Sequence, residues 1–145
     1  MEFSAFANKI FKESIDRYHV KNDVYQTFVN PYANDDITKL LYQKNWIDTV
    51  QWHYEDLIRD PEIDPVEALK LKRKIDASNQ ERTDKVEEID AYFLDQYRNV
   101  DIKDDATINT ESPAWAFDRL SILALKIYHM REEADRKDAS KAHRL

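Results

Sequence analysis

The chain of 145 residues contains no glycine, and this absence restricts its fold more than any other feature. Glycine makes up about 7% of an average chain, so about ten glycines would be expected at this length. Two-residue hairpins rely on Asn-Gly or Asp-Gly turns, and the dinucleotide-binding and Walker A phosphate loops both require glycine. The sequence therefore disfavours antiparallel sheets, excludes both phosphate loops and predicts a mainly helical protein.

The chain also lacks cysteine, which excludes thiolate nucleophiles, disulfide frameworks and zinc ribbons. No apolar stretch approaches the roughly 18 residues of a membrane-spanning helix, and the N-terminus lacks the basic start and apolar centre of a secretion signal. The net charge of −7 disfavours nucleic acid, which attracts clustered Lys and Arg. We expect a soluble, cytoplasmic protein whose partner is neither a membrane nor a nucleic acid.

Proline divides the chain into segments, because it is poorly tolerated inside a helix but fits the first helical turn. The four prolines are Pro31, Pro61, Pro65 and Pro113. Asp64 and Ser112 precede proline and are expected to cap helices, and Asp35 or Asp36 is expected to cap another. The predicted helices cover about residues 3–18, 36–59, 65–97 and 113 onward, with a polar loop over 99–111.

Two of these helices suggest how the fold is arranged. The third is predicted to be about 50 Å long, because about 33 residues rise 1.5 Å each. The fourth is apolar around most of its circumference over residues 120–128, which is typical of a helix enclosed by others. We therefore predict an all-α fold, a single bundle of four main helices with the third long and the fourth central. A chain of this length can bury one core, so residues 1–145 are expected to form one helical domain.

Asn79 and Arg82 interrupt the apolar stripe of the third predicted helix, between Ile75 and Val86. A buried guanidinium needs a carboxylate or several carbonyls around it, because an unpaired buried charge is costly. The pair predicts either a polar layer that fixes helix register or an anion-binding arginine in a cleft. The partner of Arg82 is expected among Asp48, Glu55, Asp56 and Asp118.

Two histidines each lie one helical turn before a carboxylate, at His53-x-x-Asp56 and His129-x-x-Glu132. On facing helices, such pairs could bind zinc, iron or manganese. The chain nevertheless lacks the Glu-x-x-His of di-iron bundles and the His-Glu-x-x-His of zincins. Metal binding is therefore one alternative, and the sequence assigns no cofactor. Trp52 falls on the polar side of its helix and is expected to pack under the first helix or the long loop, or to form a subunit contact.

A run of carboxylates with spacings of three and four lies on the third predicted helix. Such a run can hold magnesium when a second helix supplies matching acids, as in the helical nucleotide pyrophosphohydrolases. The second predicted helix lacks the Glu-Glu-x-x-Glu pattern of those enzymes, so a solvated face balanced by lysines is the favoured interpretation. The carboxylates are Glu81, Asp84, Glu87, Glu88 and Asp90.

Three long strings carry a family resemblance: LYQKNWIDTVQWHYEDLIRDP over 41–61, LKRKIDASNQERTDKVEEID over 71–90 and TESPAWAFDRLSILALKIYHM over 110–130. They resemble an uncharacterised bacterial family typical of Bacteroides, the domain of unknown function 4254. The resemblance implies a helical protein and attaches no activity to it. Members of that family continue beyond the position of Leu145 with a further basic helix, which implies that this chain is a C-terminally truncated form.

The sequence leaves two hypotheses for function. The first is a non-enzymatic helical interaction protein, self-associating as a homo-oligomer, in which the polar layer around Arg82 is architectural. The alternative is a small enzyme or ligand binder with a polar cleft between helices, dependent on a divalent metal and acting on a phosphorylated small molecule. Neither hypothesis identifies a protein or small-molecule partner. The candidate polar cluster consists of His53, Asp56, Asn79, Arg82, Asp118 and His129.

Overall fold

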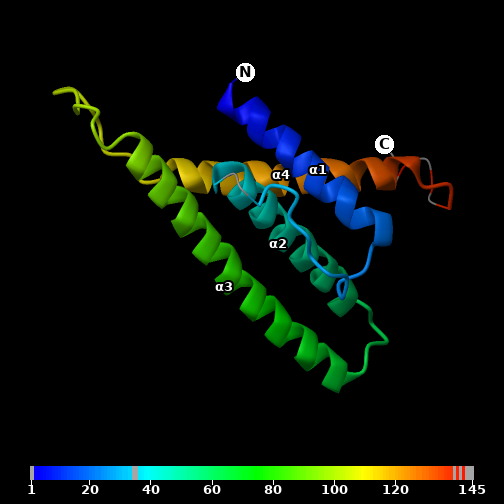
Figure 1. Cartoon of the computed structure of the whole chain (residues 1–145). Coiled ribbons are helices and arrows are strands. Elements are labelled where there is room, and N and C mark those ends of the chain that lie inside the picture. The colour runs from blue at the N-terminus through cyan, green and yellow to red at the C-terminus, as the bar shows by residue number, and fades with distance from the viewer. Residues whose placement is uncertain (1, 34–35, 139, 141, 143–145) are drawn as a thin grey trace.

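The computed structural model describes residues 2–33, 36–138, 140 and 142, and within these ranges it is built from α-helices without strands. The long helices are α1 (Phe3–Lys21), α2 (Asp36–Ile58), α3 (Pro65–Gln96) and α4 (Pro113–Asp135) (Figure 1). The predicted all-α class, the four main helices and the long third helix are confirmed. The long third helix contains 32 residues.

The ends of the helices follow local chemistry. The Asp64 side chain accepts hydrogen bonds from the first-turn amides of α3, and Ser112 does the same for α4, each beside a proline in the first turn. Both predicted caps are therefore confirmed. Asp35 and the side chain of Asp36, expected to cap α2, lie outside the described part of the chain. α1 ends at Asn22, which takes the left-handed conformation (φ 50°) that glycine would normally supply.

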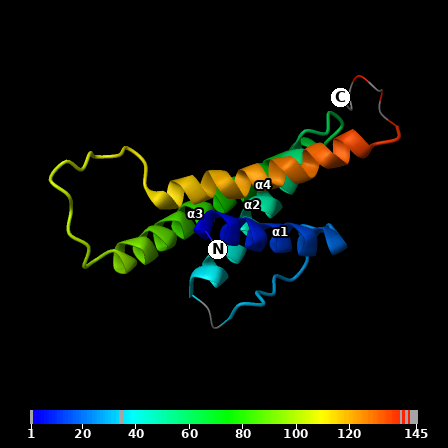
Figure 2. The ribbon, with the colours of Figure 1, turned by 90° about the horizontal axis from the view of Figure 1, so that it is seen from above.

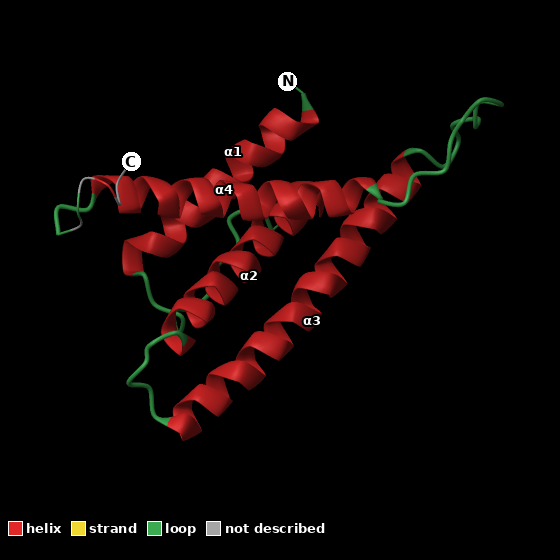
Figure 3. Ribbon diagram, turned by 180° about the vertical axis from the view of Figure 1, so that it is seen from behind, coloured by secondary structure: helices red, strands yellow, loops and turns green. Residues whose placement is uncertain are grey.

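Helix α2 lies between α1 and α3, and it packs against both of them. Figure 1 shows these three helices running along a similar diagonal, with α4 crossing them. The same crossing is seen from behind in Figure 3. The loop between α3 and α4 projects beyond the bundle (Figure 2). It carries no regular secondary structure over residues 101–111, as predicted.

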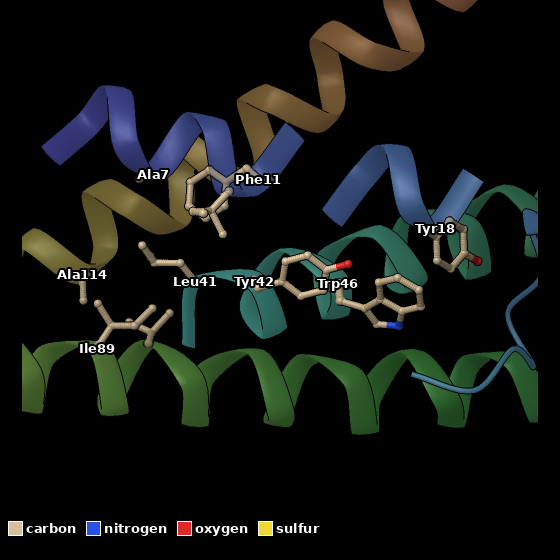
Figure 4. Close-up of a cluster of buried hydrophobic side chains, with 10 residues drawn as sticks. Ala7, Phe11, Tyr18, Leu41, Tyr42, Trp46, Ile89 and Ala114 are labelled. Atoms are coloured by element: carbon tan, nitrogen blue, oxygen red, sulfur yellow. The ribbon is translucent and has the colours of Figure 1, made fainter. Parts of the chain in front are cut away.

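The core forms where α1, α2, α3 and the start of α4 meet. Figure 4 shows side chains from all four helices meeting there, with Phe11, Leu41 and Ile89 among them. Burying such apolar side chains contributes about 25 cal/mol for each Å² removed from water. The buried members of this cluster are Ala7, Ile10, Phe11, Tyr18, Leu41, Tyr42, Trp46, Val86, Ile89 and Ala114.

The position of α4 differs in one respect from the prediction. α4 contacts each of the other three helices, as a central helix does, but α2 is the more enclosed of the two. Six consecutive residues of α2, 44–49, are buried, whereas only one face of α4 is buried. On the other face Leu123, Ile127 and Met130 are 48%, 44% and 61% exposed. The fold therefore covers one face of α4, which includes Asp118 and Ser121, and leaves an apolar face open.

Candidate functional site

The six residues of the predicted polar cluster lie in two separate places. Arg82 and Asp118 belong to a network of charges between α2, α3 and α4, which is buried except for Arg82, whose side chain is 29% exposed. His53, Asp56 and His129 line a cleft formed by α1, α2 and α4. The sequence thus identified members of two sites and joined them into one.

The buried network is built around Asp118 on α4. Arg82 donates two hydrogen bonds to this carboxylate, from Nε to Oδ1 (2.9 Å) and from Nη2 to Oδ2 (3.2 Å). The ammonium of Lys44 lies 2.8 Å from Asp118 Oδ1 and also donates to Asp48. Arg82 Nε lies 3.9 Å from Asp48 Oδ1. The expected carboxylate partners of Arg82 therefore include Asp118 and Asp48, and this prediction is confirmed.

Neutral side chains extend the network across the interface of α2 and α4. Ser121 donates from Oγ to Asp48 Oδ2 (2.7 Å) and accepts a hydrogen bond from Asn45 Nδ2 (2.9 Å). Thr49 donates to the Asn45 carbonyl (2.7 Å). Because the network has partners on three helices, it fixes how those helices are positioned along one another.

The charges of this network balance, with two cations and two carboxylates. Burial raises the pKa of Asp48 above its ordinary value, although Lys44 and Ser121 act in the opposite direction. Burial would also raise the pKa of Asp118, but the hydrogen bonds and charges of Arg82 and Lys44 outweigh it and lower this pKa. Every charged side chain in the network is thus engaged by another, which favours the interpretation of a polar layer that fixes register.

Asn79 does not lie in the buried seam of α3, and this part of the prediction is wrong. The buried residues of α3 are Ile75, Ser78, Val86 and Ile89. After Ile75, the next buried residue is therefore three positions further, at Ser78, and not four positions further, at Asn79. Asn79 is exposed, and its Oδ1 accepts hydrogen bonds from Gln51 Nε2 (2.9 Å) and from Arg82 Nη1 (3.4 Å), so it borders the network of Arg82. The small hydroxyl of Ser78 fits the contact with α2 and donates to Gln51 Oε1 (3.4 Å).

The second place is a cleft of about 490 Å³ that we call the imidazole cleft, because His19, His53 and His129 all line it. These histidines come from α1, α2 and α4 respectively. Asp56 and Glu132 also line the cleft, so both predicted histidine–carboxylate pairs face the same space. Among the described residues, however, no three His, Asp or Glu side chains are placed to hold a metal ion together.

Each imidazole is held by a hydrogen bond at Nδ1. His19 Nδ1 lies 2.7 Å from the Ile15 carbonyl oxygen, and because a carbonyl only accepts, Nδ1 carries the proton. His129 Nδ1 lies 2.8 Å from a carboxylate oxygen of Glu132, and His53 Nδ1 lies 2.6 Å from the Tyr18 hydroxyl. Burial lowers the pKa of His19 and raises that of Tyr18. His19 and Tyr18 are therefore held in their neutral forms.

Trp52 stacks on His129, with ring centroids 4.8 Å apart and planes 7° from parallel. The tryptophan therefore covers an imidazole of α4, and not the first helix or the long loop as predicted. The acidic run on α3 behaves as predicted for a solvated face. Its members Glu81, Asp84, Glu87 and Glu88 are exposed, and Lys85 lies 2.9 Å from Glu88.

The exposed apolar face of α4 was missed in the sequence, although its signal is there. It follows steps of four and three residues along α4, the spacing of apolar residues in coiled coils. At 100° per residue, it lies on the opposite side of the helix from the buried face. A groove of about 500 Å³ between α1 and α4 runs beside it and shares Leu120, Leu123 and Ile127. This surface, called the outer seam below, consists of Ala116, Leu120, Leu123, Ile127, Met130 and Ala134, of which Leu120 is half-buried and also packs against the core.

Residues 38–145 match the model of the family described as "Protein of unknown function (DUF4254)". The chain belongs to this family. The match begins in α2 and includes all of α3 and α4, so it contains the buried network and the outer seam. No curated protein and no solved structure gives a significant match to the chain.

The family match also separates the two sites. α1 precedes the matched segment, so His19 and Tyr18 of the imidazole cleft lie outside it, whereas the buried network lies wholly within it. Within the described residues, no helix combines the length and the apolar character needed to cross a bilayer. Location in the cytoplasm stays a prediction from composition.

Proposed function

We propose that this chain, acting as a single helical domain, is a non-enzymatic interaction protein that associates with a second copy of itself through the outer seam. The observation that carries the proposal is the apolar face of α4 that the fold leaves open to solvent. Apolar residues spaced by four and three along a helix are the pattern that pairs helices in coiled coils.

The dimensions of the outer seam suit the pairing of one helix with another. From Ala116 to Ala134 it extends for about 27 Å along the axis of α4. This is shorter than three heptads, so association is expected to depend on protein concentration. The groove beside the seam adds apolar surface from α1, with Ile15 among its lining residues.

The charges beside the seam favour a second copy in the antiparallel orientation. Arg119, Lys126 and Glu133 follow one edge of the seam at intervals of seven residues. In an antiparallel pair centred near Lys126, Arg119 of each copy faces Glu133 of the other. Within one chain Arg119 is paired with Glu111 and Glu133 with Arg136, so the contacts of the dimer would exchange or extend these pairs. One like-charged contact between the two Lys126 side chains opposes these two attractive pairs. In a parallel pair this edge would face the opposite edge of the second copy, so the two attractive pairs between Arg119 and Glu133 would not form.

The alternative, an enzyme acting on a phosphorylated molecule, receives less support. A phosphate site needs a guanidinium that is free to bind oxyanions, whereas Arg82 is already held at two atoms by Asp118. In the imidazole cleft Glu133 is paired with Arg136 and Asp56 lies 4.0 Å from Arg59, and the carboxylate of Glu132 repels a phosphate.

Sedimentation equilibrium from about 1 µM to about 1 mM tests the proposal. The average mass of the wild-type protein is expected to rise from 17.3 kDa toward twice that value. The double variant Leu123→Glu with Ile127→Glu is expected to stay monomeric throughout, because it places four carboxylates in the apolar contact of the dimer.

Ile108→Glu is the matched control, because Ile108 is 99% exposed and lies in the loop between α3 and α4, away from the seam. This variant is expected to associate as the wild-type protein does. A wild-type mass that stays at 17.3 kDa, or a double variant that associates normally, would contradict the proposal.

A further inference from the structure

The imidazole cleft adjoins the outer seam and shares Met130 with it, but its histidines lie away from the seam, toward α1 and α2. We propose that this cleft is a binding site for a divalent transition-metal ion, with Nε2 of His19 and Nε2 of His129 as its two protein ligands. The site is new with respect to the function proposed above and does not depend on it.

The first argument is the state of the two rings. A neutral imidazole has one N–H and one lone pair, so a ring that donates from Nδ1 offers its lone pair at Nε2. His19 donates from Nδ1 to the Ile15 carbonyl, and His129 is paired through Nδ1 with the Glu132 carboxylate. Metal-binding histidines show this same arrangement, in which the other ring nitrogen donates to a carbonyl or a carboxylate. Both rings therefore have Nε2 available as a ligand.

The second argument is the position of the rings. Their centroids lie 5.4 Å apart. Two imidazoles that share one ion at metal–nitrogen distances of about 2.1 Å have centroids about 5 Å apart, so little movement is needed. Each ring is also held by an aromatic neighbour, His19 by Tyr128 (4.2 Å) and His129 by Trp52 (4.8 Å). Ligands that are held in place before binding lose less conformational entropy when the ion arrives.

The third argument is the character of the ligands and of the space around them. Imidazole nitrogen favours zinc, copper, cobalt and nickel over magnesium and calcium, which prefer oxygen. Asp56, Glu132 and Glu133 line the same cleft together with Lys126. Glu133 is paired with Arg136 and Asp56 lies 4.0 Å from Arg59, so the carboxylate that favours a cation is Glu132, beside His129. Because the described residues offer no third preformed ligand, water or one of these carboxylates completes the coordination, and the affinity is expected to be modest.

His53 supplies a matched control within the same cleft. Its Nδ1 is paired with the Tyr18 hydroxyl, and it makes no ring contact with His129 among the described contacts. Replacing His53 therefore removes an imidazole from the cleft and leaves both proposed ligands in place.

Calorimetric titration of the full chain with Zn²⁺ alone, at about pH 7.5, tests the site. Wild-type protein is expected to bind one ion per chain. His19→Gln and His129→Gln should each weaken binding at least tenfold, the double variant should remove it, and His53→Gln should change it less than threefold. Thermal unfolding without metal checks that each variant is folded.

A second measurement uses the wild-type protein and so depends on no variant. Long-range ¹H–¹⁵N correlation spectra of the imidazoles should show that Zn²⁺ shifts Nε2 of His19 and His129 and leaves their Nδ1 atoms protonated. The proposal is overturned if the wild-type chain binds no Zn²⁺ up to about 1 mM, or if the double variant binds as tightly as wild type. It is equally overturned if the shifted nitrogens belong to other histidines.

Discussion

At the scale of single residues, the most demanding feature is a lysine enclosed by the bundle. The side chain of Lys44 is 1% exposed and contacts the carboxylates of Asp48 and Asp118. Removing an ammonium from water is costly, and the cost is offset only by well-placed partners. Arg82 is needed as well, because two buried carboxylates beside one lysine would leave a net negative charge. The four side chains are therefore expected to act as one unit.

Asp118→Asn tests this interdependence. The substitution leaves two cations beside one carboxylate, and it is expected to lower the free energy of unfolding by about 3 kcal/mol. Urea denaturation followed by circular dichroism measures the change. Asp56→Asn is the control, because Asp56 is exposed and its nearest cation, on Arg59, is 4.0 Å away. Asp56→Asn should lower the free energy of unfolding by less than about 0.5 kcal/mol. Equal losses in the two variants would show that the network is not the unit described.

Protonation of His19 is expected to couple stability to pH. Burial lowers the pKa of folded His19 below the ordinary value of 6.5. The unfolded chain therefore takes up this proton first as the solution is acidified, and acidification favours unfolding. The free energy of unfolding should fall as the pH drops below 6.5 toward the folded pKa. In His19→Gln this part of the decrease should be missing. Parallel curves for the two proteins would refute the coupling.

At the scale of the elements, helix boundaries could be predicted because they depend on neighbouring residues. Asp64 and Ser112 cap α3 and α4 through side-chain oxygens that reach the first-turn amides, and proline fixes the first turn. The choice between Ser78 and Asn79 was different. A stripe that continues three or four residues beyond Ile75 is equally regular, and only the contact with α2 selects Ser78.

The buried network could be predicted only in part, for a similar reason. Lys44 lies four residues after Leu40 and three before Ile47, on the apolar stripe of α2. That position was a signal of burial, but Lys44 and Asp48 at a spacing of four also suit a solvated ion pair. The carboxylate of Asp118, 74 positions further along the chain, makes burial possible, and its approach depends on how α4 crosses α2.

The end of α1 gives a prediction about a single backbone position. Asn22 has φ 50° and donates its backbone N–H to the Tyr18 carbonyl (2.9 Å). The left-handed conformation costs most residues with a Cβ about 1 kcal/mol or more. The cost is smaller for asparagine and smallest for glycine. Asn22→Ala should therefore lower the free energy of unfolding by about 1 kcal/mol, whereas Asn22→Gly should leave it unchanged or raise it. Chemical denaturation of both variants decides this, and a reversed order would contradict the assigned conformation.

At the scale of the whole molecule, the arrangement of the helices explains why one face of α4 is left over. α1, α2 and α3 lie side by side, and α4 crosses them with one face against all three. No further helix among the described residues covers the opposite face, although it is as regularly apolar as a coiled-coil seam. A second copy of the chain is the partner proposed for this open apolar face.

Intermolecular spin-label distances test this arrangement most directly, because the chain has no cysteine and a single substitution places one label per copy. In the antiparallel dimer, labels at Lys126→Cys lie near the two-fold axis and should be less than about 25 Å apart. Labels at Asp135→Cys should be separated by about 27 Å more along the helix axis, because each lies nine residues further from the axis of symmetry. A short distance at Lys126 and a long one at Asp135 is the predicted result. The absence of intermolecular coupling at both positions would contradict the proposed dimer.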